Sequence, residues 1–125
     1  MTILKSLRED FSQALEKFRQ VLAEDKNEFI RDAAIKRFEI VFDLAWRTLK
    51  AALEEKGLRC SSPKECFREA YKQKLINYED KFLDLISERN YVVHIYSEKL
   101  AERIFKDLPS FLKIFEELKD IFDKE

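Results

Sequence analysis

Apolar residues recur at steps of three and four along most of the chain, the spacing that lines one face of an α-helix. The first stretch predicts a helix from about Ile3 to Glu24, which the polar residues 24–27 end. A second, longer helix is predicted from about Glu28 to Lys56. Gly57, the only glycine, follows at a position where many helices end in the left-handed conformation. The buried stripe of the second helix is expected to comprise Ile35, Phe38, Phe42, Trp46, Leu49 and Leu53.

The second half of the chain predicts three further helices. The residues Ser62-Pro63-Lys64-Glu65 match a capping box, in which Ser62 accepts from the amide of Glu65 and Glu65 answers back. A short helix should therefore begin at Pro63 and run to about Lys74. A fourth helix is expected to carry Phe82, Leu83, Leu85 and Ile86 inward. Ser97 predicts the cap of a last helix whose apolar seam includes Leu100, Ile104, Phe111, Phe115, Leu118 and Phe122.

The low content of turn-forming residues decides the fold class. One glycine and two prolines in 125 residues are too few for the many tight turns of an all-β protein. We therefore predict an all-α fold, an antiparallel four- to five-helix up-and-down bundle with a short third helix. The length is below the roughly 150 residues usual for a domain, so residues 1–125 should form a single domain.

The charge balance narrows the possible partners. The chain has 24 basic and 25 acidic side chains, so its net charge is close to zero although 39% of its residues are charged. This balance excludes a polycation that binds nucleic acid by bulk charge. The start lacks a signal-peptide core and no 18 apolar residues run together, so we expect a soluble, cytoplasmic protein without a membrane partner.

Few residues suggest a cofactor or a metal. The sequence contains no glycine-rich phosphate loop and no HExxH pattern, and we expect neither cofactor nor metal. Glu39 and Asp43 lie one helical turn apart and could together bind a metal, but the basic residues beside them favour ion pairs. Cys60 and Cys66 do not form a CxxC motif, and we predict free thiols in a reducing compartment, with a redox or metal role as the alternative.

The chemistry-bearing residues gather at the end of the fourth predicted helix. Within eight residues lie Arg89, Asn90, His94 and Tyr96, and His94 is the only histidine. Positions 89 and 94 point about 140° apart on a helix, so Arg89 and His94 of one chain converge only if the helix bends. A two-fold partner offers another route, because it can place the arginine of one chain opposite the histidine of the other. The structural alternative is an arginine that reaches an acidic neighbour and a half-buried histidine.

These residues resemble a known family signature. The run Arg89-Asn90-Tyr91-Val92-Val93-His94-Ile95-Tyr96 looks like the RNxxxHxY motif of the HEPN superfamily, specifically of the HepT-like, nucleotidyltransferase substrate-binding proteins. Two further blocks support the resemblance, in the same order as in that family. One runs from Arg37-Phe38-Glu39 through Phe42 to Ala45-Trp46, and the other comprises Ser62-Pro63 and Phe67-Arg68-Glu69-Ala70. Within the first block we interpret Trp46 as a packing residue and Arg37 and Glu39 as ion-paired positions, with a place in the lining of the groove as the alternative.

The resemblance implies a helical bundle that forms a homodimer, with the motif near the two-fold axis. Members of the family typically work beside a small separate nucleotidyltransferase. The resemblance first favours a substrate-binding partner subunit, in which Arg89, Asn90, Tyr91, His94 and Tyr96 contact a nucleotide or the partner protein.

Two alternatives stay open. The first is a metal-independent ribonuclease toxin, in which Arg89 and His94 are catalytic, Asn90 supports them, and the partner silences the protein by attaching AMP to Tyr96. Because each chain has one histidine, a dimer is the way to supply two imidazoles for the two proton transfers of RNA cleavage. The second alternative is a structural helical dimer without catalysis, and enzymatic activity is left open.

Overall fold

The described part of the chain is entirely helical. The computed structural model describes residues 2–77, 80–92 and 97–124. Within these ranges it contains α1 (Ile3–Leu22), α2 (Glu28–Glu55), α3 (Pro63–Lys72), α4 (Asp80–Val92) and α5 (Glu98–Asp123). The all-α prediction is confirmed, and α1, α2 and α3 begin where predicted and end one or two residues earlier than predicted. His94 and Tyr96 of the motif lie outside the described residues.

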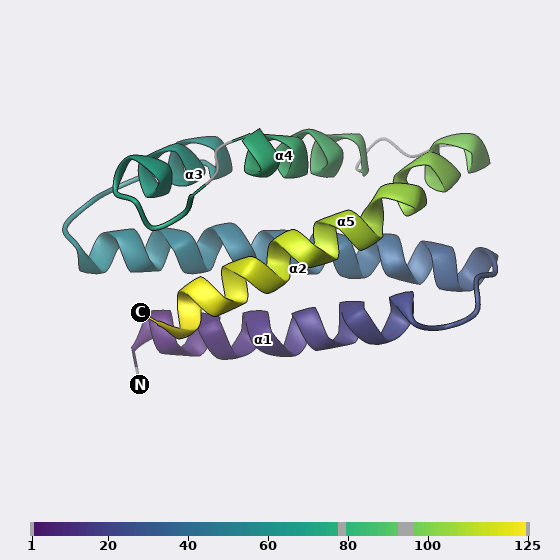
Figure 1. Ribbon diagram of the computed structural model, residues 1–125, viewed down its shortest axis with the longest axis horizontal. Helices are drawn as coiled ribbons and strands as arrows, with labels where there is room; N and C mark the ends of the chain where they lie inside the picture. The colour runs from purple at the N-terminus through teal and green to yellow at the C-terminus, as the bar shows by residue number, and fades with distance from the viewer. Residues whose placement is uncertain (1, 78–79, 93–96, 125) are drawn as a thin grey trace.

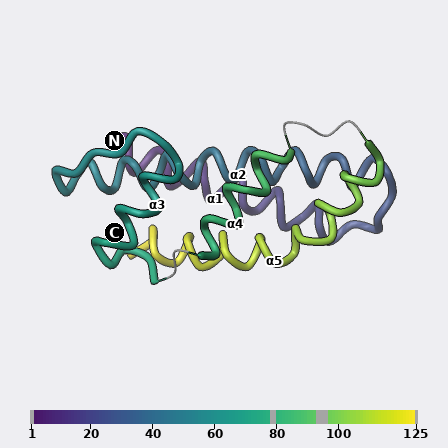
Figure 2. Tube along the Cα trace, turned by 90° about the horizontal axis from the view of Figure 1, so that it is seen from above, coloured from purple at the N-terminus to yellow at the C-terminus, as the bar shows by residue number. Residues whose placement is uncertain are grey.

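The long helix α2 is the centre of the bundle and contacts every other helix. The antiparallel α1 lies along one side of α2, and α3 and α4 follow each other along the opposite side (Figure 1). α5 crosses α2 obliquely and ends beside the start of α1, where the Arg8 guanidinium donates to the carbonyl of Phe122. The view from above shows α4 over the middle of the bundle and the first turns of α5 at one end of it (Figure 2). This arrangement brings the motif helix α4 onto the middle of α2.

Side-chain caps define where the helices begin. The side chains of Thr2, Asn27 and Ser97 accept from backbone amides in the first turns of α1, α2 and α5. Ser62 accepts from the amide of Glu65 at 3.2 Å, as the capping box predicts. The return bond differs from the expected one, because Glu65 accepts from the amide of Ser61 rather than from that of Ser62. The hydroxyl of Ser61 also donates to this carboxylate, which lowers the pKa of Glu65.

The end of α2 and the middle of α5 follow the behaviour of glycine and proline. Gly57 has a φ of +80°, the left-handed conformation that the sequence predicts for it. A side chain at this position would be strained even though the space around it is open. α5 continues through Pro109, although proline removes one backbone donor from the helix.

Aromatic rings fill the centre of the bundle. Phe38 of α2 contacts Phe18 of α1 and Phe111 and Phe115 of α5, with ring centroids 5.5–6.4 Å apart. A second contact, the stacking of Phe67 on Phe82 at 5.0 Å, joins α3 to α4. Large rings with edge and offset contacts gain more than their buried area alone provides. The aromatic stripes therefore form the core, as predicted, and α4 is held in place through α3 as well as through α2.

The two cysteines contradict the sequence-based prediction. Cys60 and Cys66 form a disulfide, with their Cα atoms 5.1 Å apart, so the prediction of free thiols is wrong. The loop before α3 folds back over its first turn, and this brings together two positions that the sequence places in different elements. Both residues are buried in a small cluster with Leu53. The disulfide therefore ties the α2–α3 connection to α3.

None of the described helices is long and apolar enough to span a lipid bilayer.

Candidate functional site

A groove runs along α2 beneath the end of α4 and the start of α5. It consists of two adjoining depressions of about 370 and 380 Å³, which share Lys36 and Glu39 of α2. The first lies under α4 and is also lined by Ile40, Asp43, Leu44 and Arg89. The second extends towards α5 and is also lined by Arg31, Ile35, Val92, Ser97 and Glu98. We call the two depressions together the α2 groove.

Arg89, the first residue of the motif, faces this groove. Its guanidinium lies over the Phe42 ring, 5.9 Å from the ring centroid, and the side chain is partly buried. The ring face attracts the cation and supports its apolar side, which restricts the guanidinium to the α2 side of α4. The donors of a guanidinium form a planar fork that matches a phosphate or a carboxylate. Arg89 is therefore a held cation at the wall of the groove.

The next motif residues point elsewhere. Asn90 is exposed, and the ring of Tyr91 is 50% exposed on the far side of α4, where the Arg103 guanidinium of α5 lies 5.7 Å from its centroid. Positions two apart on a helix differ by about 200° in direction, which explains why Arg89 and Tyr91 contact different helices. The structure thus separates Arg89 from Tyr91 within one chain. The predicted pairing of Arg89 with His94 and the place of Tyr96 lie outside the described residues.

The face of α4 that carries Tyr91 also contains a perturbed carboxyl. Burial raises the pKa of Glu88 above its ordinary value, and the negative charge of Asp107 on α5 raises it further. Arg103 acts in the opposite direction without cancelling these effects. Glu88 is therefore protonated more easily than a free glutamate, on the side of α4 away from the groove.

The groove carries charges of both signs. Lys36 and Arg89 provide the cations, and Glu39 and Asp43 provide carboxylates. The Asp43 carboxylate also accepts a hydrogen bond from the indole of Trp46 at 3.3 Å. It pairs with Arg47 at 3.2 Å, one turn away. A ligand with both an anionic group and hydrogen-bond donors would complement this lining.

Two expectations about α2 concern metal binding and ion pairs. The described residues contain no cluster of three or more residues that could hold a metal, so Glu39 and Asp43 remain a pair without further ligands there.

Glu39 makes no ion pair with any described residue and lines both depressions, and Arg37 likewise has no described ion-pair partner. The interpretation of Arg37 and Glu39 as ion-paired positions is therefore not supported within the described ranges. Glu39 lies in the groove instead.

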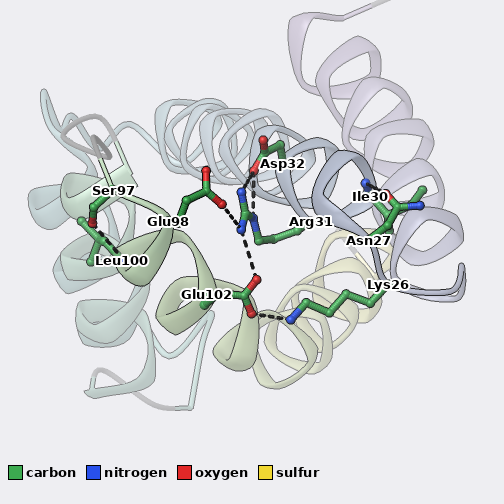
Figure 3. Close-up of polar contacts among 9 residues, drawn as sticks. All are labelled: Lys26, Asn27, Ile30, Arg31, Asp32, Ser97, Glu98, Leu100 and Glu102. Carbon is green, nitrogen blue, oxygen red and sulfur yellow. Dashed lines mark hydrogen bonds and ion pairs between the residues drawn. The ribbon is translucent and has the colours of Figure 1, made fainter.

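Sequence reasoning missed the most highly connected charge at the groove, Arg31. Its side chain is only 4% exposed, and it pairs with Asp32 at 2.9 Å, with Glu98 at 2.6 Å and with Glu102 at 3.1 Å (Figure 3). Glu102 also pairs with Lys26 from the α1–α2 connection. One signal could have identified Arg31, because it lies four residues before Ile35 on the apolar stripe of α2.

These contacts shift the pKa values in the directions that ion pairing requires. The hydrogen bonds that the guanidinium donates to Glu98 and Asp32 raise the pKa of Arg31 above its already high value, so the group stays charged. The contacts of Lys26 and Arg31 lower the pKa of Glu102 below its ordinary value. Both groups are therefore ionised at neutral pH, and the ion pairs persist there.

A larger open depression, of about 710 Å³, lies at the opposite end of α2. Its lining includes Lys50, Glu54, Arg59 and the disulfide residue Cys60. No residue of the RNxxxHxY motif is among the described residues that line it. Arg89 of the motif instead lines the α2 groove, which we take as the candidate site.

This chain is similar to two proteins of known structure. The crystal structure of ttk003001694 from Thermus thermophilus is 34% identical and superposes with a TM-score of 0.82 over 90% of this chain and 98% of that chain. HI0074 from Haemophilus influenzae, a structure described as revealing the fold of a substrate binding domain of a nucleotidyltransferase, is 20% identical. It matches with a TM-score of 0.71 over 97% of both chains, which shows a shared fold. No protein of curated function matches significantly.

The family assignment rests on nearly the whole chain. The family model for proteins like the nucleotidyltransferase substrate binding protein matches residues 5–124. The match includes α1 from residue 5 onward, the other four described helices, the groove and the motif. This chain therefore belongs to the nucleotidyltransferase substrate binding protein-like family.

Proposed function

We propose that this protein is the substrate-binding subunit of a nucleotidyltransferase system, works beside a small separate nucleotidyltransferase, and receives a nucleotide in the α2 groove. The observation that carries the proposal is the position of Arg89, which joins the motif to a groove that also contains Lys36. Arginine and lysine on opposite walls can hold a phosphate between them. The family match along residues 5–124 supports the same role.

The carboxylates of the groove favour a nucleotide over a longer polyanion. Glu39 and Asp43 accept hydrogen bonds from ribose hydroxyl or base amino groups, which a nucleotide presents a few ångströms from its phosphates. A long nucleic acid would bring many phosphates past these carboxylates, and the near-neutral chain offers little compensating charge. The groove thus suits one nucleotide with its phosphate at Arg89.

Two binding measurements test this function. The nucleotidyltransferase encoded nearest to this chain should co-purify with it at physiological salt, and the fluorescent ATP analogue MANT-ATP should bind the chain. Arg89→Ala should weaken MANT-ATP binding about tenfold or more, because it removes a charge-assisted contact. Arg19→Ala is the matched control, since Arg19 is an ion-paired arginine on α1, away from the groove. Equal affinity of Arg89→Ala and wild type for MANT-ATP would contradict the proposal.

A homodimer of the HEPN type belongs to the same proposal. Asn90 and Tyr91 are exposed at the end of α4, where a second copy would meet them and add its own motif residues to the site. His94 and Tyr96 of the two copies would then complete the set of nucleotide- and partner-binding residues. Light scattering after size exclusion should give twice the chain mass of 15.0 kDa. A mass of one chain at micromolar concentration would refute the dimer.

A metal-independent ribonuclease is the second candidate, and the position of the Arg89 guanidinium, held over Phe42 at the groove, favours it. Strand cleavage at a 2′-hydroxyl needs a cation for the phosphorane and groups that move protons, and Arg89, Glu39 and His94 are of these types. In this role the partner would silence the chain by attaching AMP to Tyr96. Expression without the partner should then arrest growth, and His94→Ala should abolish the arrest. Intact RNA and normal growth would reject this candidate, and failure of nucleotide and partner binding as well would leave a structural dimer.

A further inference from the structure

Arg31 anchors the start of α5 to α2 at one end of the α2 groove. The carboxylates of Asp32, Glu98 and Glu102 surround its guanidinium. Glu102 forms a further ion pair with Lys26. We call Lys26, Arg31, Asp32, Glu98 and Glu102 the Arg31 cluster. Figure 3 shows the guanidinium between α2 and the first turns of α5, with the carboxylates converging on it.

The cluster is a costly way to stabilise a bundle. The Arg31 side chain is only 4% exposed, so its charge loses hydration, whereas its three carboxylate partners are at least 40% exposed and water screens their attraction to it. The rest of the contact between α2 and α5 uses apolar side chains such as Phe38 and Phe111, whose ring centroids are 5.5 Å apart. An apolar residue at position 31 would continue this packing, because Arg31 lies on the buried stripe of α2. The stability of the fold therefore does not explain why the position carries a guanidinium.

Geometry offers a better explanation. Apolar contacts are non-directional, and they allow a helix to slide or rotate by small amounts. A guanidinium whose donors are directed at Glu98 and Glu102 prevents the first two turns of α5 from rotating about the helix axis or sliding along it relative to α2. Lys26 adds a second cation to Glu102 and ties the α1–α2 connection to the same place.

The fixed turn of α5 forms a wall of the groove. Arg31, Ser97 and Glu98 line the depression that shares Lys36 and Glu39 with the depression at Arg89. Val92, the last residue of α4, lines it from the other side. The groove is therefore bounded by the end of α4 and the beginning of α5, and its width depends on where α5 begins.

We propose that Arg31 is a positioning residue, which sets the width of the α2 groove by holding the first turns of α5 against α2. This inference rests on the proposed function, since it assigns Arg31 a role in nucleotide binding at Arg89. Arg31 does not need to contact the nucleotide, because its donors are already directed at Asp32, Glu98 and Glu102.

The test combines hydrogen exchange with nucleotide binding in the full-length chain. Arg31→Leu should unfold at a temperature close to that of wild type, because the packing of leucine on the apolar stripe offsets the loss of the ion pairs. Its backbone amides at 100–102 should nevertheless exchange about tenfold faster, and its affinity for MANT-ATP should fall about tenfold. Arg31→Lys keeps the charge without the planar fork, and both effects should be intermediate. Arg19→Gln removes a cation that pairs α1 with α5 at an exposed site, and neither measurement should change.

A milder variant covers the case in which Arg31→Leu does not fold. Glu98→Gln keeps a hydrogen-bonding group at an exposed position and removes one ion pair, so exchange and affinity should shift in the same directions by smaller factors. Unchanged exchange at 100–102 in these variants would overturn the positioning role. Faster exchange with unchanged MANT-ATP affinity would also overturn it, because the groove would then not depend on the start of α5. Failure of wild type to bind MANT-ATP would instead refute the proposed function, and that measurement precedes the variants.

Discussion

The guanidinium of Arg89 lies over the ring of Phe42, with its central carbon 5.9 Å from the ring centroid. The contact joins a core residue to a groove residue, because Phe42 is part of the core of α2 and Arg89 lines the groove above it. The ring that packs the bundle therefore also orients the cation at the groove. Residues of α2 whose loss affects the core should for this reason affect binding as well.

Substitutions of Phe42 and Arg89 should have different effects on the free energy of unfolding. Phe42→Ala should cost about 3–5 kcal/mol of unfolding free energy, because it removes a buried aromatic ring. Arg89→Ala should cost no more than about 1 kcal/mol, the size of a partly exposed cation–π contact. Urea unfolding followed by circular dichroism measures both. A loss of several kcal/mol in Arg89→Ala would mean that Arg89 is a structural residue rather than one kept for a ligand.

Glu88 should make the bundle less stable at neutral pH than at mildly acidic pH. Its pKa is raised in the folded state, so the folded chain holds this proton more tightly than the unfolded chain does. The resulting stabilisation is complete below the ordinary glutamate pKa of 4.5 and is lost as the pH rises through the raised value. Glu88→Gln should therefore be more stable than wild type at pH 7, by about 0.5 kcal/mol or less.

Thermal melts of Glu88→Gln and wild type between pH 3 and pH 8 test this prediction, and the quantity measured is the difference between their melting temperatures at each pH. The difference should shrink towards acidic pH, where the wild-type carboxyl is protonated in both states. A variant that is less stable than wild type at pH 7 would show that the attraction between Glu88 and the Arg103 charge outweighs the effect of burial.

Glu102 should show the opposite pH dependence. Lys26 and Arg31 lower its pKa in the folded state, so its contribution is present above the ordinary pKa of 4.5 and is lost as the pH falls through the lowered value. Glu102→Gln should lower the melting temperature at pH 7 and have a smaller effect at pH 3. Substituting Glu9, exposed on α1, by glutamine is the control. An effect of Glu102→Gln that does not vary with pH would argue against an ionised cluster.

Reduction of the disulfide should destabilise the protein without unfolding it at room temperature. Closing a ring of about seven residues restricts the unfolded chain by about 2 kcal/mol in the chain-entropy description. A reductant such as TCEP should therefore lower the melting temperature of wild type and leave Cys60→Ala/Cys66→Ala unchanged. Identical melts of wild type with and without TCEP, with reduction confirmed by thiol labelling, would contradict this contribution.

Some features of the protein follow from the sequence because they are local. The apolar stripes predict the long helices, Ser62 and Ser97 begin their helices as predicted, and Gly57 adopts the left-handed conformation. Helix periodicity and capping depend on residues within about four positions of each other, so a linear pattern contains the information. The motif that starts at Arg89 is likewise readable from eight consecutive residues.

Other features required the tertiary structure, because they depend on which helices meet. Arg31 and Glu102 are 71 positions apart, and only the crossing of α2 and α5 makes them an ion pair. The turn before α3 decides that Cys60 and Cys66 meet, which their spacing alone did not reveal. The packing of α4 on α2 turns Arg89 towards the groove and Tyr91 away from it. The sequence by itself thus determined the helices and their chemical residues, whereas the packing of those helices decided which residues share a site, since long-range contacts have no local signature.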